Sequence, residues 1–304
     1  MTKSILIAGG TGFIGYHLSK KCLKMGWNVT SISTSYPKKE KKINGVKYIL
    51  ADLSKKKNLT KVKKIFNYVV NLSGYVDHTN KKKTLNSHYQ GCKNLADKFE
   101  KTNIEKFIQI GSSIEYGKLK SPQIENSKNL QNTYSYYGKA KLMSTKYLLK
   151  LYKEKNFPVT IIRLYLVYGP KQETNRVIPI TIKNALQNKK FGCSEGSQFR
   201  DFTYIDDVIS AIIKVLKNKK ISDGEIINVG TRKPVKIRYL INKICSIIGL
   251  GNPIFGKINL RKDEIDKLYP NIDKAKKILR WKPNTSLING LKKTIRFYEN
   301  EKYN

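Results

Sequence analysis

Cysteine, acidic residues and long apolar runs are all scarce in this sequence. Its four cysteines among 304 residues lie far apart, at Cys22, Cys92, Cys193 and Cys245. Because no Cys-x-x-Cys pair occurs, they argue against a metal site or a disulfide framework and indicate buried thiols in a reducing compartment. No apolar run approaches the about 20 residues of a membrane span, and the one at the N-terminus is shorter than a signal-peptide core of about 7–15 residues. We therefore expect a cytoplasmic protein with no metal and no membrane partner.

Arginine is scarce relative to lysine. The chain has 60 basic and 22 acidic residues, hence a net charge of +38, yet only eight of the basic residues are arginine. A nucleic-acid-binding protein would be expected to use more arginine, since the planar guanidinium recognises phosphates and guanine edges. The lysines lie in short groups such as KKEKK and NKKKT, which is typical of solvated surfaces. We expect no nucleic-acid partner, although this field would attract an anionic substrate.

Short apolar strands alternate with amphipathic helices through the first two thirds of the chain. The pattern predicts strands at 4–9, 28–33, 46–52, 68–73, 106–113 and 159–167, and helices at about 13–25, 89–101 and 134–155. This alternation indicates an α/β fold with a doubly wound parallel sheet (Rossmann). We expect a dinucleotide-binding domain of residues 1–170 plus about 201–230. A smaller C-terminal substrate-binding lobe would comprise about 171–200 plus 231–304.

A glycine loop, AGGTGFIG, follows the first predicted strand. Gly10, Gly12 and Gly15 form G-x-G-x-x-G between a strand and a helix. Without side chains the backbone can approach a pyrophosphate at the helix N-terminus. The loop therefore predicts a dinucleotide site. The residues expected to contact the cofactor here are Gly9, Gly12, Phe13, Ile14 and Gly15.

The end of the second predicted strand bears on the choice of cofactor. An acid is expected here to bind the ribose of NAD, but the sequence has Ser33, with Lys38 and Lys39 close behind. With no carboxylate to repel a 2′-phosphate, this favours NADP(H) and leaves NAD(H) possible. Asp52, after the third strand, is placed to bind the adenine amino group. The cofactor site is expected to include also Leu53, Leu72, Ser73 and Gly74.

The segment YSYYGKAKL carries a candidate catalytic pair. Tyr137 and Lys141 are four residues apart on a predicted helix and so share a face, whereas Tyr134 and Tyr136 lack a lysine at that spacing. A nearby ammonium favours phenolate, which would let Tyr137 exchange a proton. Ser112 ends the fifth predicted strand at the same sheet edge, where such folds bind ligands.

Together these motifs resemble the extended short-chain dehydrogenase/reductases, specifically the NAD(P)-dependent nucleotide-sugar epimerase/dehydratase family. The likeness includes the glycine loop, the Ser-x-x-x-Tyr-Gly segment 112–117, the Tyr137–Lys141 pair, and the stretches RLYLVYGP, FRDFTYIDDV and DKAKKILRWKP. It spans nearly the whole chain. The resemblance implies an enzyme in which Tyr137 is the acid/base, Lys141 also binds the nicotinamide ribose, and Ser112 binds the reacting oxygen.

The resemblance also implies a nucleotide-sugar substrate. Arg200 and Arg261 would clamp its two phosphates, with Arg176 lining the same site. Ser113 and His78 are further expected substrate contacts. Two positions depart from the family, which usually has Asn where this chain has His88 and Leu166. A structural role is expected for His88, and a hydrogen bond to the cofactor or substrate is the alternative.

The type of reaction remains open among members of this family. Sugar 4,6-dehydratases carry an Asp-Glu pair directly after the catalytic hydroxyl residue, whereas here Ser113 and Ile114 follow, so dehydration is not expected. Ser33 favours an NADP(H)-dependent reductase of a 4-keto-6-deoxyhexose. The alternative is an NAD-dependent 4-epimerase, and a distant one is a non-catalytic dinucleotide sensor or RNA-binding scaffold. Relatives often dimerise through helices matching 89–101 and 134–155, so we expect a homodimer.

Overall fold

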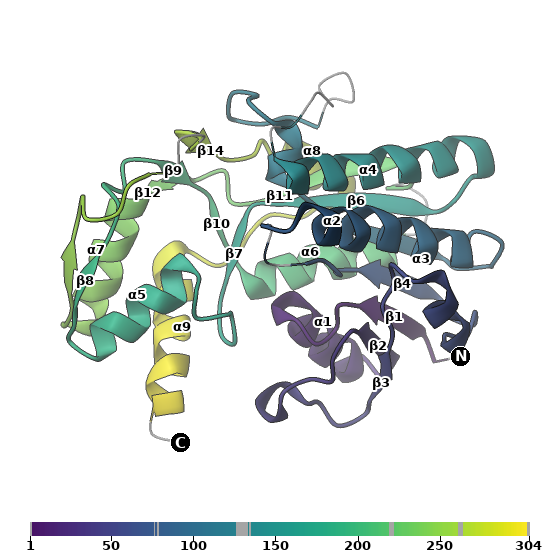
Figure 1. The fold of residues 1–304 in the computed structure, drawn as a ribbon, viewed down its shortest axis with the longest axis horizontal. Helices are drawn as coiled ribbons and strands as arrows, with labels where there is room; N and C mark the ends of the chain where they lie inside the picture. Colours follow the sequence, from purple (N-terminus) through teal and green to yellow (C-terminus); the bar gives the residue numbers. More distant parts are fainter. Residues whose placement is uncertain are drawn as a thin grey trace.

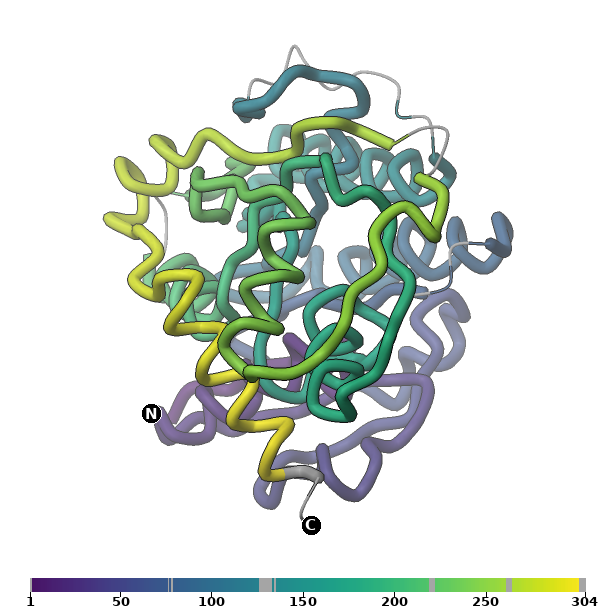
Figure 2. The backbone as a smooth tube through the Cα atoms, turned by 90° about the vertical axis from the view of Figure 1, so that its left-hand side faces the viewer, coloured from purple at the N-terminus to yellow at the C-terminus, as the bar shows by residue number. Residues whose placement is uncertain are grey.

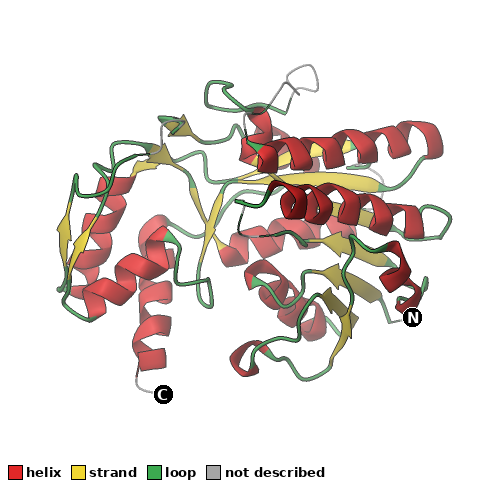
Figure 3. Ribbon diagram, viewed as in Figure 1, coloured by secondary structure: helices red, strands yellow, loops and turns green. Residues whose placement is uncertain are grey.

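A seven-stranded parallel sheet forms the centre of the larger part of the protein (Figures 1 and 3). The computed structural model describes residues 2–75, 77, 79–125, 133, 135–218, 222–260 and 264–302. The sheet has the order β11-β6-β5-β4-β1-β2-β3. Its strands are β1 (Ser4–Ala8), β2 (Asn28–Ser33), β3 (Val46–Leu50), β4 (Tyr68–Asn71), β5 (Lys106–Ser112), β6 (Val159–Leu164) and β11 (Glu225–Val229). The order reverses between β1 and β4, and the crevice at such a point is where doubly wound folds bind ligands. The predicted fold class is confirmed.

Helices cover both faces of the sheet (Figure 1). Helices α1 (Phe13–Lys24) and α6 (Ile205–Lys217) pack together on one face, while α2 (Lys81–Leu85), α3 (Gly91–Phe99) and α4 (Tyr136–Lys155) cover the other. Side chains along a strand point alternately to the two faces. Ile5 and Ile7 accordingly belong to the apolar core beneath α1 and α6, and Leu6 and Ala8 to the core beneath α3 and α4.

Three expected elements differ in detail. The strand predicted over 159–167 divides at Tyr165, and its second part, β7 (Leu166–Tyr168), pairs with β10 (Phe202–Tyr204) outside the main sheet. A π-helical turn, η3 (Asn86–Gln90), precedes α3, so this helical region begins before residue 89. The fifth strand ends at Ser112, and the 3₁₀ turn η4 (Ser113–Tyr116) follows. Each difference lies at the sheet edge where the site forms.

The smaller lobe is built from chain segments on either side of β10, α6 and β11, and it faces the viewer in Figure 2. Its helices are α5 (Val177–Leu186), α7 (Ile237–Ile248) and α9 (Leu287–Lys302). Its short strands are β8 (Lys190–Gly192), β9 (Phe199–Arg200), β12 (Val235–Lys236), β13 (Asn252–Ile254) and β14 (Lys267–Leu268). Helix α8 (Asp273–Leu279) contacts β11 and α6.

Asp207 joins the C-terminal segment to the larger part of the protein. This residue lies in the first turn of α6, and its carboxylate accepts backbone N–H groups of Asn284 and Thr285 at 3.0 Å each. Its backbone oxygen accepts the indole N–H of the buried Trp281 at 3.1 Å. Asp207 therefore anchors the linker that leads into α9.

The cysteines, the possible membrane spans and the possible metal sites can be considered over all described residues. All four cysteines are buried and free. No described helix has both the length and the apolar character to cross a membrane. Within the same residues, no group of three or more His, Cys, Asp or Glu side chains is arranged to hold a metal ion.

His17 should make stability depend on pH. Burial lowers its pKa from 6.5, although a hydrogen bond to the Pro170 carbonyl oxygen at 2.9 Å opposes this shift. Because the folded protein then binds this proton less readily than the unfolded chain, the free energy of unfolding falls as pH drops below about 6.5. Urea unfolding at about pH 7.5 and pH 5.5 should show a smaller loss in His17→Gln than in wild type. Equal losses would contradict the assignment.

Candidate active site

A cleft of about 890 Å³ opens at the carboxyl ends of β1, β2, β4 and β5 and continues toward β7. It brings together residues that are more than 150 positions apart in the sequence. The predicted site residues that line it are Gly9, Gly12, Phe13, Ile14, Gly15, Ser33, Asp52, Leu53, Leu72, Ser73, Gly74, Ser112, Tyr137, Lys141 and Arg176. The structure therefore gathers the expected cofactor positions and the expected catalytic positions in one cavity.

The glycine loop needs its glycines for two reasons. Gly9 has φ 79°, a left-handed conformation that favours glycine. A Cβ atom on Gly15 would lie 2.3 Å from the Gly9 oxygen, so only glycine lets α1 begin this close to the loop. Gly12 is the position before the first residue of α1 and lines the cleft. The loop thus presents bare backbone at a helix N-terminus, an arrangement that fits the pyrophosphate of a dinucleotide.

The ends of β2 and β3 would face the adenosine half of a dinucleotide. Ser33 donates its hydroxyl to the Ile32 carbonyl oxygen at 2.7 Å and accepts the Thr11 N–H at 3.4 Å. Asp52 accepts the N–H and the hydroxyl of Ser54 at 2.9 and 2.7 Å. Lys38 and Lys39, which the sequence offered as charge for a 2′-phosphate, are not among the cleft-lining residues, and Lys55 is.

The predicted catalytic pair, Tyr137 and Lys141, lies at the start of α4. Ser135 caps this helix by accepting the Gly138 N–H at 3.0 Å, which sets Tyr137 in the first turn. Lys141 lies one turn later, is buried, and donates from Nζ to the Ile110 carbonyl oxygen on β5 at 2.7 Å. This bond ties α4 to β5, and the i, i+4 spacing puts Lys141 on the same face of the helix as Tyr137.

Glu115 fixes Ser112 relative to α4. One oxygen of this fully buried carboxylate accepts the Ser112 N–H at 2.7 Å. The other accepts the Thr145 hydroxyl of α4 at 2.7 Å and Nη2 of Arg163 on β6 at 2.9 Å. Because Glu115 faces inward and is absent from the cleft wall, it is not positioned to act on a substrate. Its role is to hold three elements of the site in register.

From the sequence we expect a structural role for His88, but the structure places this residue at the site itself. The π-helical turn η3 places its buried ring on the cleft wall, edge-on to the Tyr137 ring with centroids 4.9 Å apart. His88 Nε2 lies 3.2 Å from the Tyr75 carbonyl oxygen. A Cβ on Gly74 would lie 2.1 Å from the imidazole, so the glycine makes room for it. The histidine at a position where the family usually has Asn was the signal in the sequence that pointed to this residue. The π-helical turn is a second signal, visible only in the structure, because such turns often occur at functional sites.

Several predicted substrate contacts lie elsewhere. Ser113 is buried in η4 and does not line the cleft. Arg200 is also absent from the cleft wall: its guanidinium pairs with Glu264 and donates to the Phe199 carbonyl oxygen at 2.7 Å. Burial lowers the pKa of Arg200 to about 10. Arg176 does line the cleft, from the position before α5. His78 and Arg261 lie outside the described residues.

Other cleft-lining residues carried no signal in the sequence. Six of them lie in loops near the ends of strands: Thr11, Lys55, Tyr75, Tyr165, Gln172 and Glu173. The other three lie in helical elements: Lys83 in α2, and Asn86 and Ser87 in η3. Lys55 and Lys83 add positive charge to a cleft suited to phosphates.

Known proteins are similar to this chain in sequence and in fold. Residues 5–230 match the model of the NAD dependent epimerase/dehydratase family. The chain belongs to this family. It is therefore an enzyme of the extended short-chain dehydrogenase/reductase type, as its motifs indicated.

The similarity to individual family members covers almost the full chain. A UDP-N-acetyl-alpha-D-glucosaminuronate decarboxylase from Bacillus cytotoxicus is 29% identical over 98% of both chains. The structure of UDP-glucose 4-epimerase from Thermotoga maritima with UDP-glucose has a TM-score of 0.90 at 25% identity, covering 98% of this chain and 99% of that one. UDP-glucuronic acid 4-epimerase from Bacillus cereus, in complex with UDP-glucuronic acid and NAD, has a TM-score of 0.87 at 26% identity with the same coverage.

Replacing Glu115 should strongly destabilise the protein. Glu115→Gln keeps the shape but leaves the buried Arg163 guanidinium without its counter-charge, which typically costs about 3–5 kcal/mol. Urea unfolding measures this loss. A matched control is Glu154→Gln, which removes a carboxylate from an exposed pair with Lys150 on α4 and should change stability far less. Similar losses in the two variants would contradict the role given to Glu115.

Proposed function

We propose that this family member is an NAD(P)-linked oxidoreductase that transfers a hydride at a ring carbon, C4, of a nucleoside-diphosphate sugar. The observation that carries the proposal is the convergence of Ser112, Tyr137 and Lys141 in the cleft that the glycine loop also lines. The two solved relatives reported above hold UDP-sugars, which supports this class of substrate. Arg176, Lys55 and Lys83 on the cleft wall offer positive charge for its phosphates.

Each of the three residues has a separate task in the proposed reaction. The bound nicotinamide cofactor supplies or accepts the hydride. Tyr137 gives the proton to the carbonyl oxygen as it becomes a hydroxyl, or removes it in the reverse direction. Lys141, anchored on the Ile110 carbonyl oxygen, lies one helical turn after Tyr137 on the same face of α4, where it can bind the nicotinamide ribose. Ser112 donates a hydrogen bond to the reacting oxygen, from a position fixed by Glu115.

Water elimination is not supported by the groups available. Among the described residues that line the cleft, carboxylates occur only at Asp52 and Glu173. Asp52 is bonded to Ser54 at the adenosine end, and Glu173 lies 3.4 Å from Lys41 Nζ. Neither is placed beside Ser112 in the chain, where the dehydratase acids stand.

Two net reactions fit this chemistry. Ser33 and Thr34 at the end of β2 leave the cleft without a carboxylate there, which favours NADP(H) and reduction of a 4-keto-6-deoxyhexose. The relative from Bacillus cereus that binds NAD and is named a 4-epimerase favours the second candidate, an NAD-dependent 4-epimerase. We propose the NADP(H)-dependent reductase as the leading candidate because Ser33 belongs to this chain.

We propose further that the enzyme is a homodimer. Helices α3 and α4 pack side by side on one face of the sheet, and Met143 of α4 is 39% exposed. A second copy pairing through these helices would cover that side chain and form a four-helix bundle.

Tyr137→Phe should lower kcat by about 10²–10⁴-fold, the usual contribution of general acid–base catalysis. It removes one oxygen and should leave cofactor affinity nearly unchanged, as measured by quenching of NADPH fluorescence. Tyr136→Phe is the matched control: the neighbouring tyrosine is exposed, lies outside the cleft, and should keep wild-type turnover. A Tyr137→Phe enzyme as fast as wild type would refute the assignment.

The cofactor preference can be reversed at one residue. Wild type should bind NADPH more tightly than NADH, and Ser33→Asp should invert this order because a carboxylate repels the 2′-phosphate. Ser35→Asp, which adds the same charge outside the cleft, should not. Titration of both reduced cofactors measures the effect.

The dinucleotide that copurifies with the wild-type protein separates the two net reactions. Exchangeable NADP(H) supports the reductase, and 4-keto sugars are then the substrates to screen. A stoichiometric NAD that survives purification would contradict the reductase and support the epimerase, to be screened with intact nucleotide sugars.

A further inference from the structure

A second cavity of about 670 Å³ shares no lining residue with the active-site cleft. Its walls come from β10, the segment after β11, helices α7 and α8, and the linker that leads into α9. This volume falls within the range of about 300–1,000 Å³ that is typical of small-molecule sites. No step of the proposed reaction uses it.

Hydrogen bonds from two buried aspartates fix opposite walls of this second cavity. Asp201 accepts the N–H and the hydroxyl of Thr231 at 2.8 and 2.9 Å. Asp207 accepts the N–H groups of Asn284 and Thr285. The backbone of both walls is therefore held in place before any ligand arrives.

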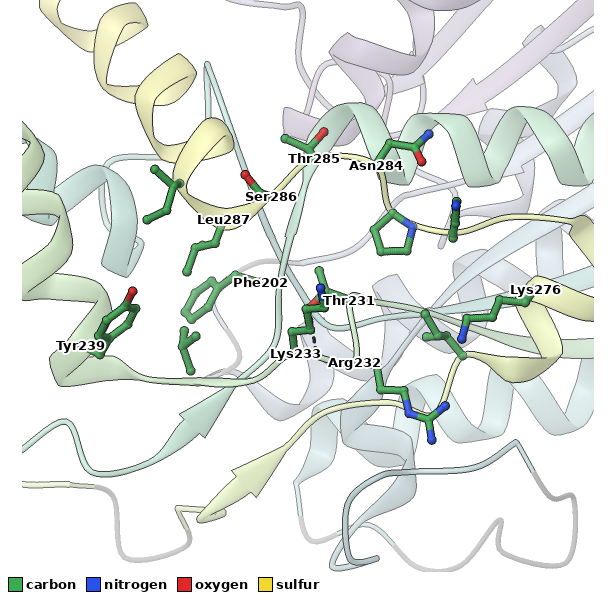
Figure 4. A pocket seen from close by; sticks show the side chains of 15 residues that line it. Phe202, Thr231, Arg232, Lys233, Tyr239, Lys276, Asn284, Thr285, Ser286 and Leu287 are labelled. Atoms are coloured by element: carbon green, nitrogen blue, oxygen red, sulfur yellow. Dashed lines mark hydrogen bonds between the residues drawn. The ribbon is translucent and has the colours of Figure 1, made fainter.

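Four basic residues give the cavity positive charge, with Arg232 and Lys276 at one end and Lys233 nearer the middle (Figure 4). The basic residues that line it are Arg232, Lys233, Lys276 and Lys282. Asp273 is the carboxylate that meets them, at 2.9 and 3.0 Å from Arg232 Nη1 and 3.4 Å from Lys276 Nζ. In the described part of the chain, no carboxylate lies within 4.0 Å of the ammonium of Lys233 or Lys282. Four cations around one small space repel each other, and a bound anion would relieve that repulsion.

The other end of the cavity is apolar. Figure 4 shows Tyr239, Phe202 and Leu287 gathered on one side, with Lys276 and Arg232 on the other. Phe202 is 5% exposed, whereas Tyr239 leaves half of its surface open to solvent. An aromatic ring in a ligand would cover this surface by stacking or edge-on contact.

We propose that this cavity binds an anion of nucleotide size, with a phosphate group held by Lys233, Lys276 and Arg232 and a planar ring packed against Tyr239 and Phe202. Lysine is a common phosphate partner, and the ring and phosphate would lie at opposite ends of the same cavity. The site also has a short connection to the active-site cleft. Asp201, whose carboxylate accepts hydrogen bonds from Thr231 in the cavity, accepts through its carbonyl oxygen the N–H of the cleft residue Leu166 at 3.1 Å.

This link between the second cavity and the cleft consists of hydrogen bonds to the carboxylate and the backbone oxygen of the buried Asp201. No surface loop has to move to form it. Leu166 belongs to β7, and β7 pairs with β10, which contributes Phe202 to the cavity. The wall between the two sites is thus only two strands thick.

The test uses 2-naphthyl phosphate as the probe and calorimetric titration of the whole protein. Wild type should bind it, and Lys233→Gln/Lys276→Gln should weaken binding at least about tenfold, because a charge-assisted hydrogen bond is typically worth more than the 1.4 kcal/mol of one decade. The matched control is Lys277→Gln/Lys292→Gln, which removes two equal charges from α8 and α9 outside the cavity. The affinity of this control for 2-naphthyl phosphate should stay within about twofold of that of wild type, because exposed charges outside the cavity contribute little.

A third variant tests the apolar end. Tyr239→Ala should weaken 2-naphthyl phosphate and leave inorganic phosphate unchanged. These substituted side chains are exposed, and thermal unfolding checks that each variant is folded.

Three results would overturn the proposal. The first is equal weakening in the two double variants, which would assign binding to the overall field of a +38 protein. The second is loss of probe binding when NADPH or NADH saturates the cleft, which would place the probe there. The third is no detectable binding by wild type.

Discussion

The buried ion pair between Glu115 and Arg163 is the constraint on which the active site depends. Two charges removed from water must satisfy each other and every remaining hydrogen-bonding position, or the protein pays a large desolvation cost. Glu115 accepts bonds from the end of β5, from α4 and from β6, whereas Nη1 of Arg163 is buried with no hydrogen-bond partner among the described residues. The Arg163 guanidinium also lies over the Tyr116 ring at 4.2 Å, and the Tyr116 hydroxyl donates to Asn228 on β11 at 2.7 Å. Ser112 and the helix of Tyr137 thereby keep one relative position.

This pair also explains a sequence feature that the motifs alone leave unexplained. A Cβ on Gly111 would lie 2.5 Å from Glu115 Oε1, so the carboxylate can turn inward only beside glycine. Glycine at 111 and glutamate at 115 are therefore one structural unit. Arg200, Arg232 and Arg238 also pair with carboxylates, but the pairs of Arg232 and Arg238 are exposed.

The features that could be predicted from the sequence are those set by short-range patterns. The sheet, the glycine loop and the Tyr137–Lys141 face follow from residues within about one strand or one helical turn of each other. Other features depend on distant partners. Arg200, expected at the substrate phosphates, pairs with Glu264, 64 positions later, and does not line the cleft, so its contact with the substrate stays a prediction. The strand over 159–167 divides because β7 finds its partner in β10. His88 reaches Tyr137 only because η3 is a π-helical turn.

The order of strands along the chain has a consequence for how the protein is made. Strand β6 pairs on one side with β5, while its partner on the other side, β11, begins only at Glu225. During synthesis the outer edge of β6 therefore stays open until α5, β10 and α6 have been made. An open edge strand readily pairs with other chains, so the nascent chain passes through a stage at which it can associate wrongly. The larger part of the protein cannot finish folding before the first segment of the lobe has emerged.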